Sequence, residues 1–173
     1  MRTRILICLL FLSAAVAQDE PKRGPSTPEE RARFLALTHK LEQAPLDKSL
    51  YEEKKWALKW IEDIPDINVT PCPTALGPDL INSRYPYASQ LLYQVVLGNV
   101  AFLIEHPEKK EDLVAQYTAG VESALKAYKG ILRADPVASR QMDELLKKQS
   151  EGKLTEFVKA SIKDCQGGAQ TGL

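Results

Sequence analysis

The chain has 173 residues, and its 23 basic side chains balance 23 acidic ones. This length suits a single domain. The neutral balance gives no electrostatic reason to expect nucleic acid or an anionic membrane as a partner, because both attract basic proteins.

The N-terminus has the three parts of a secretory signal peptide. Two arginines precede an apolar run at 5–12, and small residues up to Ala17 supply a cleavage site. Spanning a bilayer takes about 20 apolar residues. The run is too short for that, so we expect no stable membrane insertion after cleavage. We predict that residues 1–17 are removed and that the mature protein is secreted or periplasmic.

Cleavage would also remove Cys8, which leaves Cys72 and Cys165 as the cysteines of the mature chain. An even pair of cysteines in an oxidising compartment predicts a disulfide. The alternative is two free buried thiols. A bridge between residues so far apart would remove about 4 kcal/mol of unfolded-chain entropy.

The helical domain is predicted to span 27–165, after a leader at 18–26 that has no apolar side chain to bury and is expected to be flexible. Thr27 and Glu30 have the spacing of a capping box at the start of a helix. This helix is expected to stop before Pro45.

A second helix is expected to open at Asp47 or Ser49, with Glu52 completing another capping box, and to end at Pro65. Its inward stripe has helical spacing and includes Trp60.

Residues 66–86 are rich in proline, so neither a helix nor a central strand can persist there. Apolar residues such as Ile67, Leu76 and Leu80 nevertheless recur along this loop. We therefore expect the loop to be held against the body of the protein by Cys72.

A third helix, at about 87–105, is apolar around nearly its whole circumference and is expected at the centre of a bundle. Gln90, Gln94 and Gly98 form its one narrow polar or small stripe.

Three further helices are predicted after this central one. A long helix at about 107–134 has apolar residues in alternating steps of three and four. Asp135 and Pro136 would then start a fifth helix that ends at Gly152, with Ala138 on its inward side. The last helix, at about 153–164, places Cys165 on its inward face, and a disordered tail is expected at 166–173.

Together these patterns predict an all-α fold: a small bundle of five to six helices with a proline-rich loop pinned by one disulfide.

The sequence lacks the signatures of metal, nucleotide or nucleophilic chemistry. Its histidines, His39 and His106, are not spaced as a ligand pair on one helix face. It has no Gly-x-Ser-x-Gly elbow and no glycine-rich phosphate loop. We therefore predict no catalytic residue, no metal and no cofactor.

Three aromatic residues near the proline-rich loop, Trp56, Tyr85 and Tyr87, form the candidate binding surface, since such side chains are favoured in interfaces. The leading hypothesis is a non-enzymatic binding module, such as an inhibitor, an immunity-type protein or an accessory subunit, whose partner is another envelope protein. One alternative is a small envelope hydrolase that uses Glu62 and neighbouring carboxylates. The other is a periplasmic chaperone.

Overall fold

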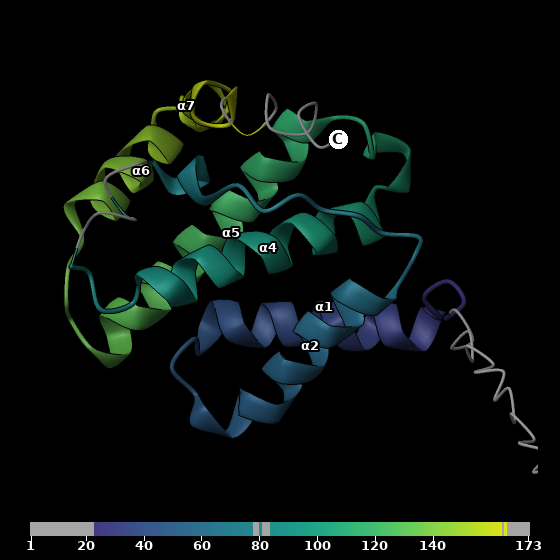
Figure 1. Cartoon of the computed structure of the whole chain (residues 1–173). Helices are drawn as coiled ribbons and strands as arrows, with labels where there is room; N and C mark the ends of the chain where they lie inside the picture. Colours follow the sequence, from purple (N-terminus) through teal and green to yellow (C-terminus); the bar gives the residue numbers. More distant parts are fainter. Residues whose placement is uncertain (1–22, 78–79, 81–83, 164, 166–173) are drawn as a thin grey trace, which may run out of the picture.

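The computed structural model describes residues 23–77, 80, 84–163 and 165, and these form helices and connections without a strand (Figure 1). The predicted all-α fold is therefore confirmed. The predicted signal peptide, Cys8, the start of the leader and the tail at 166–173 lie outside the described residues. The α-helices are α1 (Pro28–Gln43), α2 (Tyr51–Asp63), α4 (Ala88–Glu105), α5 (Leu113–Ala134), α6 (Arg140–Ser150) and α7 (Leu154–Ser161).

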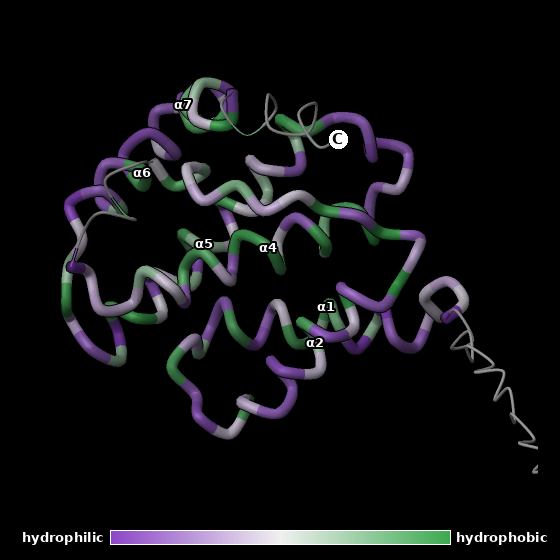
Figure 2. Tube along the Cα trace, viewed as in Figure 1, coloured by the Kyte–Doolittle hydropathy of each residue, from purple (hydrophilic) through white to green (hydrophobic). Residues whose placement is uncertain are grey.

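The central pair of helices is α4 and α5, which pack against each other more extensively than any other two described elements. In Figure 1, α1 and α2 lie on one side of this pair, while α6, α7 and a 3-10 turn in the proline-rich loop, η2 (Pro73–Leu76), lie on the other. Hydrophobic segments in Figure 2 run along α4 and α5, and hydrophilic ones follow the outer connections. This arrangement gives two clusters of buried side chains, with α4 contributing to both.

The contact between α4 and α5 depends on two glycines. A Cβ atom added to Gly98 would lie 2.8 Å from the Cα atom of Gly120, and one added to Gly120 would lie 2.6 Å from the carbonyl oxygen of Val95. Both positions are closer than a side chain tolerates, so the two backbones pass in direct contact. Gly98 and Gln94 of the predicted stripe thus face α5, whereas Gln90 is exposed.

Helix α4 is less completely covered than its composition predicts. Gln94 is buried, whereas the apolar side chains of Tyr93 and Val96 are only half-buried. Among the described helices, α4 is the one with the length and apolar composition to cross a membrane, and half of it is buried inside the protein.

A buried polar network joins α1 to the central pair. The Gln94 amide donates hydrogen bonds to the Ser123 hydroxyl at 2.8 Å and to the Thr38 carbonyl at 3.2 Å. Ser123 donates in turn to Glu42 at 2.7 Å, and Lys126 forms an ion pair with the same carboxylate at 3.2 Å. The network satisfies polar groups that burial would otherwise penalise, and it fixes how α1 lies on α4 and α5.

The start of α1 matches the sequence prediction. The Glu30 amide donates to the Thr27 hydroxyl at 3.2 Å, and the Thr27 amide donates to the Glu30 carboxylate at 2.9 Å, which completes the capping box. The second predicted capping box is wrong. Asp47 is the cap, because its carboxylate accepts from the Ser49 amide at 2.8 Å, and a 3-10 turn separates it from α2.

Two helix starts after α4 lie later in the chain than predicted. Helix α5 begins at Leu113, because the Asp112 side chain caps it and Pro107 instead opens a short 3-10 turn. Helix α6 begins at Arg140, because the Ser139 side chain accepts from the amide of Met142.

The predicted fifth-helix start at Asp135 and Pro136 is therefore wrong, and so is the inward position of Ala138, which is exposed. Asp135 is the C-cap of α5, and its carboxylate accepts a hydrogen bond from the Tyr87 hydroxyl. Its side chain is thus engaged with the start of α4 rather than with a new helix.

Asp66 ties the start of the proline-rich loop to the start of α1. Its carboxylate accepts from the amide and the hydroxyl of Ser26 at 2.8 and 2.7 Å, and it forms an ion pair with Arg31 at 2.8 Å. Ser26, at the end of the predicted leader, is buried in this contact. Partial burial alone would raise the pKa of Asp66, but the bonds from Ser26 and Arg31 outweigh it and lower the pKa from 3.8 to about 2.

Replacing Asp66 by asparagine is expected to remove stability that depends on pH. A carboxyl group with a lowered pKa stabilises the fold at pH values above its unfolded pKa, and this contribution is lost as the pH falls through its folded pKa. The shift from 3.8 to about 2 corresponds to about 2 kcal/mol. Urea unfolding of both proteins should show this difference at neutral pH, and the difference should vanish once the pH is below the folded pKa. A difference that stays constant as the pH falls would contradict the role given to Asp66.

Candidate functional site

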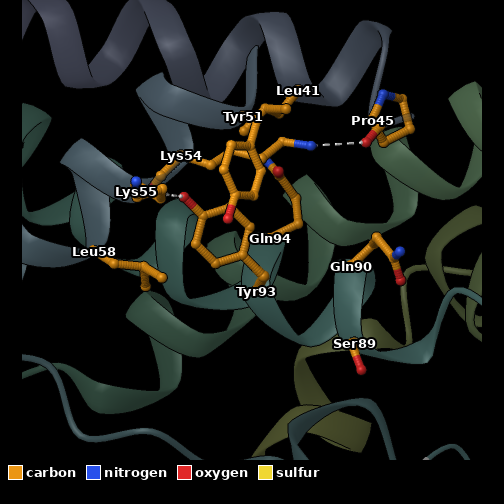
Figure 3. A pocket seen from close by; sticks show the side chains of 10 residues that line it. All are labelled: Leu41, Pro45, Tyr51, Lys54, Lys55, Leu58, Ser89, Gln90, Tyr93 and Gln94. Carbon is orange, nitrogen blue, oxygen red and sulfur yellow. Dashed lines mark hydrogen bonds between the residues drawn. The ribbon is translucent and has the colours of Figure 1, made fainter. Parts of the chain in front are cut away.

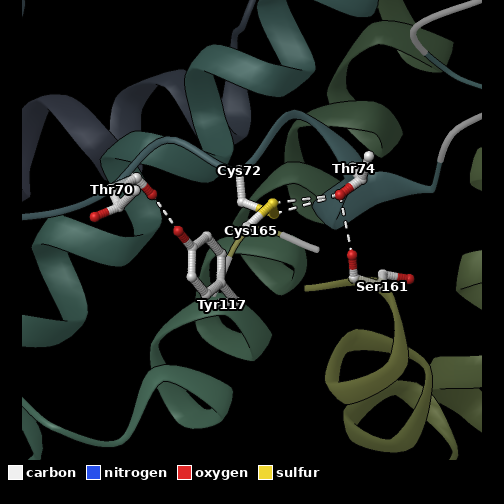
Figure 4. The surroundings of a disulfide bond; sticks show 6 residues. All are labelled: Thr70, Cys72, Thr74, Tyr117, Ser161 and Cys165. Atoms are coloured by element: carbon white, nitrogen blue, oxygen red, sulfur yellow. Dashed lines mark hydrogen bonds between the residues drawn. A yellow bond between two sulfur atoms is a disulfide. The ribbon is translucent and has the colours of Figure 1, made fainter. Parts of the chain in front are cut away.

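The disulfide lies where the proline-rich loop meets the last helix. Cys72 and Cys165 are bonded, with their Cα atoms 5.6 Å apart, which confirms the predicted bridge. Beside it, the Thr74 hydroxyl donates to the Ser161 carbonyl at 3.0 Å, and the Tyr117 hydroxyl donates to the Thr70 carbonyl (Figure 4). The loop is therefore pinned to the body, and its residues Ile67, Leu76 and Leu80 are buried, as expected.

The three aromatic residues predicted as a binding surface are not brought together. Tyr85 packs edge-on against Tyr87 and donates to the Val137 carbonyl at 3.2 Å, so both tyrosines contact the segment after α5 and the first buried cluster. Trp56 belongs to the other cluster, where it stacks on Trp60. The residues therefore form two separate sites, and a binding role for either remains a prediction.

Two of the carboxylates near the end of α2 are each paired with a cation. Asp66 is held ionised by Ser26 and Arg31, and Asp63 forms an ion pair with Lys59 at 3.0 Å. Among the residues that the structure describes, no group of three or more histidine, cysteine, aspartate or glutamate side chains could hold a metal ion.

A concave groove lies between α2 and α4 in the described part of the chain. Its first pocket has a volume of about 450 Å³ (Figure 3). The lining side chains come mainly from α2 and α4, with two from the end of α1 and the turn after it: Leu41, Pro45, Tyr51, Lys54, Lys55, Leu58, Ser89, Gln90, Tyr93 and Gln94.

A second pocket of about 530 Å³ continues the groove beyond Leu58, which lines both pockets. It is lined by Ile61 and Glu62 of α2, by Val96 of α4, and by residues at the end of α2 and the start of the proline-rich loop: Ile64, Pro65, Ile67, Asn68, Val69 and Pro71. We call the two pockets together the α2–α4 groove. From Tyr51 to Ile61 it follows about 15 Å of helix, at about 1.5 Å per residue.

The two most exposed of the large apolar side chains described both line this groove. The exposed fraction is 62% for Tyr51 and 46% for Leu58, the two highest values among the large hydrophobic residues described. Across from them, Tyr93 donates its hydroxyl to the Lys54 carbonyl at 3.1 Å and so joins α4 to α2. Burial raises the pKa of Tyr93 to about 12, so its hydroxyl remains a donor at neutral pH.

The cations of the groove lie in its first pocket. The Lys54 ammonium donates to the Pro45 carbonyl at 3.3 Å, as Figure 3 shows. Burial lowers the pKa of Lys54, while the charge of Asp47 partly opposes that shift. Lys55 is more exposed and forms an ion pair with Glu52 at 3.2 Å.

Sequence reasoning missed this groove. Tyr51 and Leu58 are seven residues apart and share one face of α2 with Lys54 and Lys55, a signal that is visible in the sequence. Nothing in the sequence shows that this face borders half-buried residues of α4, because only the tertiary packing places the two helices side by side.

Comparison with known proteins finds no match, whether with a family model, a curated protein or a solved structure.

Proposed function

We propose that this protein is a non-enzymatic binding module of the secreted or periplasmic space and that the α2–α4 groove is its binding surface. The main support for this proposal is that Tyr51 and Leu58, two exposed apolar side chains, line two adjoining pockets that are largely apolar. Exposed apolar residues that line one hollow are typical of a binding site, whereas isolated ones are ordinary surface. Volumes of about 450 and 530 Å³ are also in the range of ligand sites.

The disulfide supports the proposed compartment, because such bonds persist in oxidising environments. The predicted signal peptide agrees with that placement. Inhibitors, immunity-type proteins and accessory subunits are all modules of this kind, and each would place the protein beside another envelope protein.

The two alternative functions receive less support from the geometry. A hydrolase would need a carboxylic acid that holds its proton near neutral pH. Asp66 does not suit that role, because its pKa is lowered to about 2, and Asp63 is paired with Lys59. A general chaperone would need a broad apolar surface. Here the groove is confined between α2 and α4, which the Tyr93–Lys54 hydrogen bond joins. Such a narrow groove favours one defined ligand.

Replacing Leu58 by glutamate is expected to lower partner or ligand capture at least tenfold, because a charge would then face both pockets. Leu58 is largely exposed, so the free energy of unfolding should change by no more than about 0.5 kcal/mol. Val137→Glu is the matched control, since Val137 is 37% exposed and lies outside the groove. The measurement is affinity capture from native envelope material with the wild type and both variants. Equal capture by all three would contradict the proposal.

A further inference from the structure

We infer that the α2–α4 groove binds a free long-chain carboxylate, with the carboxylate beside Lys54 and Lys55 and the alkyl chain passing Leu58 into the second pocket. This inference rests on the proposed function and names the ligand class of the same site.

Charge is distributed unequally along the groove. Lys54 and Lys55 line the first pocket, and no carboxylate is among its lining residues. In the second pocket the charged lining residue is Glu62, and the remaining described lining is mostly apolar. A ligand with one anionic end and one apolar end matches this order. In the opposite orientation, its carboxylate would meet Glu62.

The environment of the Lys54 ammonium group favours an anionic ligand. Its ammonium group is partly buried, its hydrogen-bond acceptor is the neutral carbonyl of Pro45, and among the described carboxylates none lies within ion-pair distance of it. Partial burial of a cation is unfavourable unless an opposite charge lies close to it. The charge of Asp47 acts on Lys54 only from beyond ion-pair distance, so a carboxylate that binds here would add a direct counter-charge and form a charge-assisted hydrogen bond. Lys55 can contribute a second one, because its pair with Glu52 is exposed and therefore weak.

The groove is narrow, which favours an alkyl chain over a partner helix. The Tyr93 hydroxyl and the Lys54 carbonyl are 3.1 Å apart, so α2 and α4 are in direct contact at this point. A partner helix has a diameter of about 10 Å with its side chains and cannot lie between them. A single alkyl chain can lie along Leu58, Ile61 and Val96, the apolar residues that follow one another on the two walls.

The test is calorimetric titration of the mature, disulfide-bonded protein with sodium dodecanoate below its micellar concentration, and with 1-dodecanol as the neutral probe. We expect one dodecanoate per protein and binding at least tenfold tighter than that of dodecanol. Lys54→Met should weaken dodecanoate binding about tenfold or more and leave dodecanol binding unchanged, since methionine keeps the apolar part of the side chain. Leu58→Glu should weaken the binding of both probes.

Lys59→Met is the matched control, because Lys59 lies on α2 outside the groove and pairs with Asp63. Its titrations should equal those of the wild type. The inference is overturned if Lys54→Met leaves dodecanoate binding unaltered, or if neither probe binds. If neither probe binds but Leu58→Glu still abolishes capture of an envelope protein, the ligand class is wrong and the proposed function stands. Capture that is indifferent to Leu58→Glu would overturn the proposed function itself.

Discussion

Replacing both Cys72 and Cys165 by serine is expected to lower the free energy of unfolding by about 4 kcal/mol. The bridge joins residues separated by 93 positions, so its loss frees a long segment of the unfolded chain. Native proteins are stable by only about 5–15 kcal/mol, so the variant should be near the limit of folding. Urea unfolding, followed by circular dichroism, measures the change.

The wild-type protein unfolded in the presence of a thiol reductant is the control, and it should lose the same amount of stability as the double variant. The Thr74 and Tyr117 hydrogen bonds remain beside the missing bridge, so the native helices should survive at low temperature. A loss of less than about 1 kcal/mol would mean that these bonds hold the loop without the disulfide and would contradict the pinning role.

Replacing Trp60 by alanine is expected to cost about 3–5 kcal/mol, the range for truncating a large buried aromatic residue. Trp60 is fully buried, and its ring centroid lies 4.9 Å from that of Phe34 on α1. It is the largest fully buried side chain by which α2 is anchored on α1. The loss should therefore appear both in urea unfolding and in weaker binding at the groove, since α2 forms one of its walls.

Trp56→Ala is the matched comparison, because Trp56 is on the same helix, stacks on Trp60 and is only half-buried under Arg33. We expect it to cost clearly less than Trp60→Ala and to leave ligand binding unaltered. If the two variants lose equal stability, the assignment of Trp60 as the anchor of α2 is wrong.

The parts of the fold that could be predicted from the sequence depend on local chemistry. The capping box of Thr27 and Glu30 marks the first helix, and the parity of the cysteines predicts their pairing; both are confirmed. The helix starts near Pro107 and Pro136 were mispredicted because proline tolerates a first turn but does not require one. The caps that decide these starts, Asp112 and Ser139, lie a few residues further on.

The candidate site could not be predicted in the same way, because it depends on which helices become neighbours. Tyr93 belongs to the apolar helix α4, which is expected to be buried, and Tyr51 lies on the outer face of α2. Both residues line one groove only because α2 packs against α4. Conversely, Trp56 and Tyr85 both lie near the proline-rich loop in sequence, but the folded chain places them against different clusters.

The glycine contact between α4 and α5 has a consequence for how this protein can diverge. A side chain at Gly98 or Gly120 would collide with backbone atoms, so these two positions tolerate almost no exchange. The groove-facing positions of α2, such as Tyr51 and Leu58, touch solvent and carry no such restriction. Substitutions on α2 can therefore change what the groove prefers to bind while the helix pair beneath it keeps its geometry. The substitutions that would retune the proposed binding surface are thus separate from those that would disturb the α4–α5 contact.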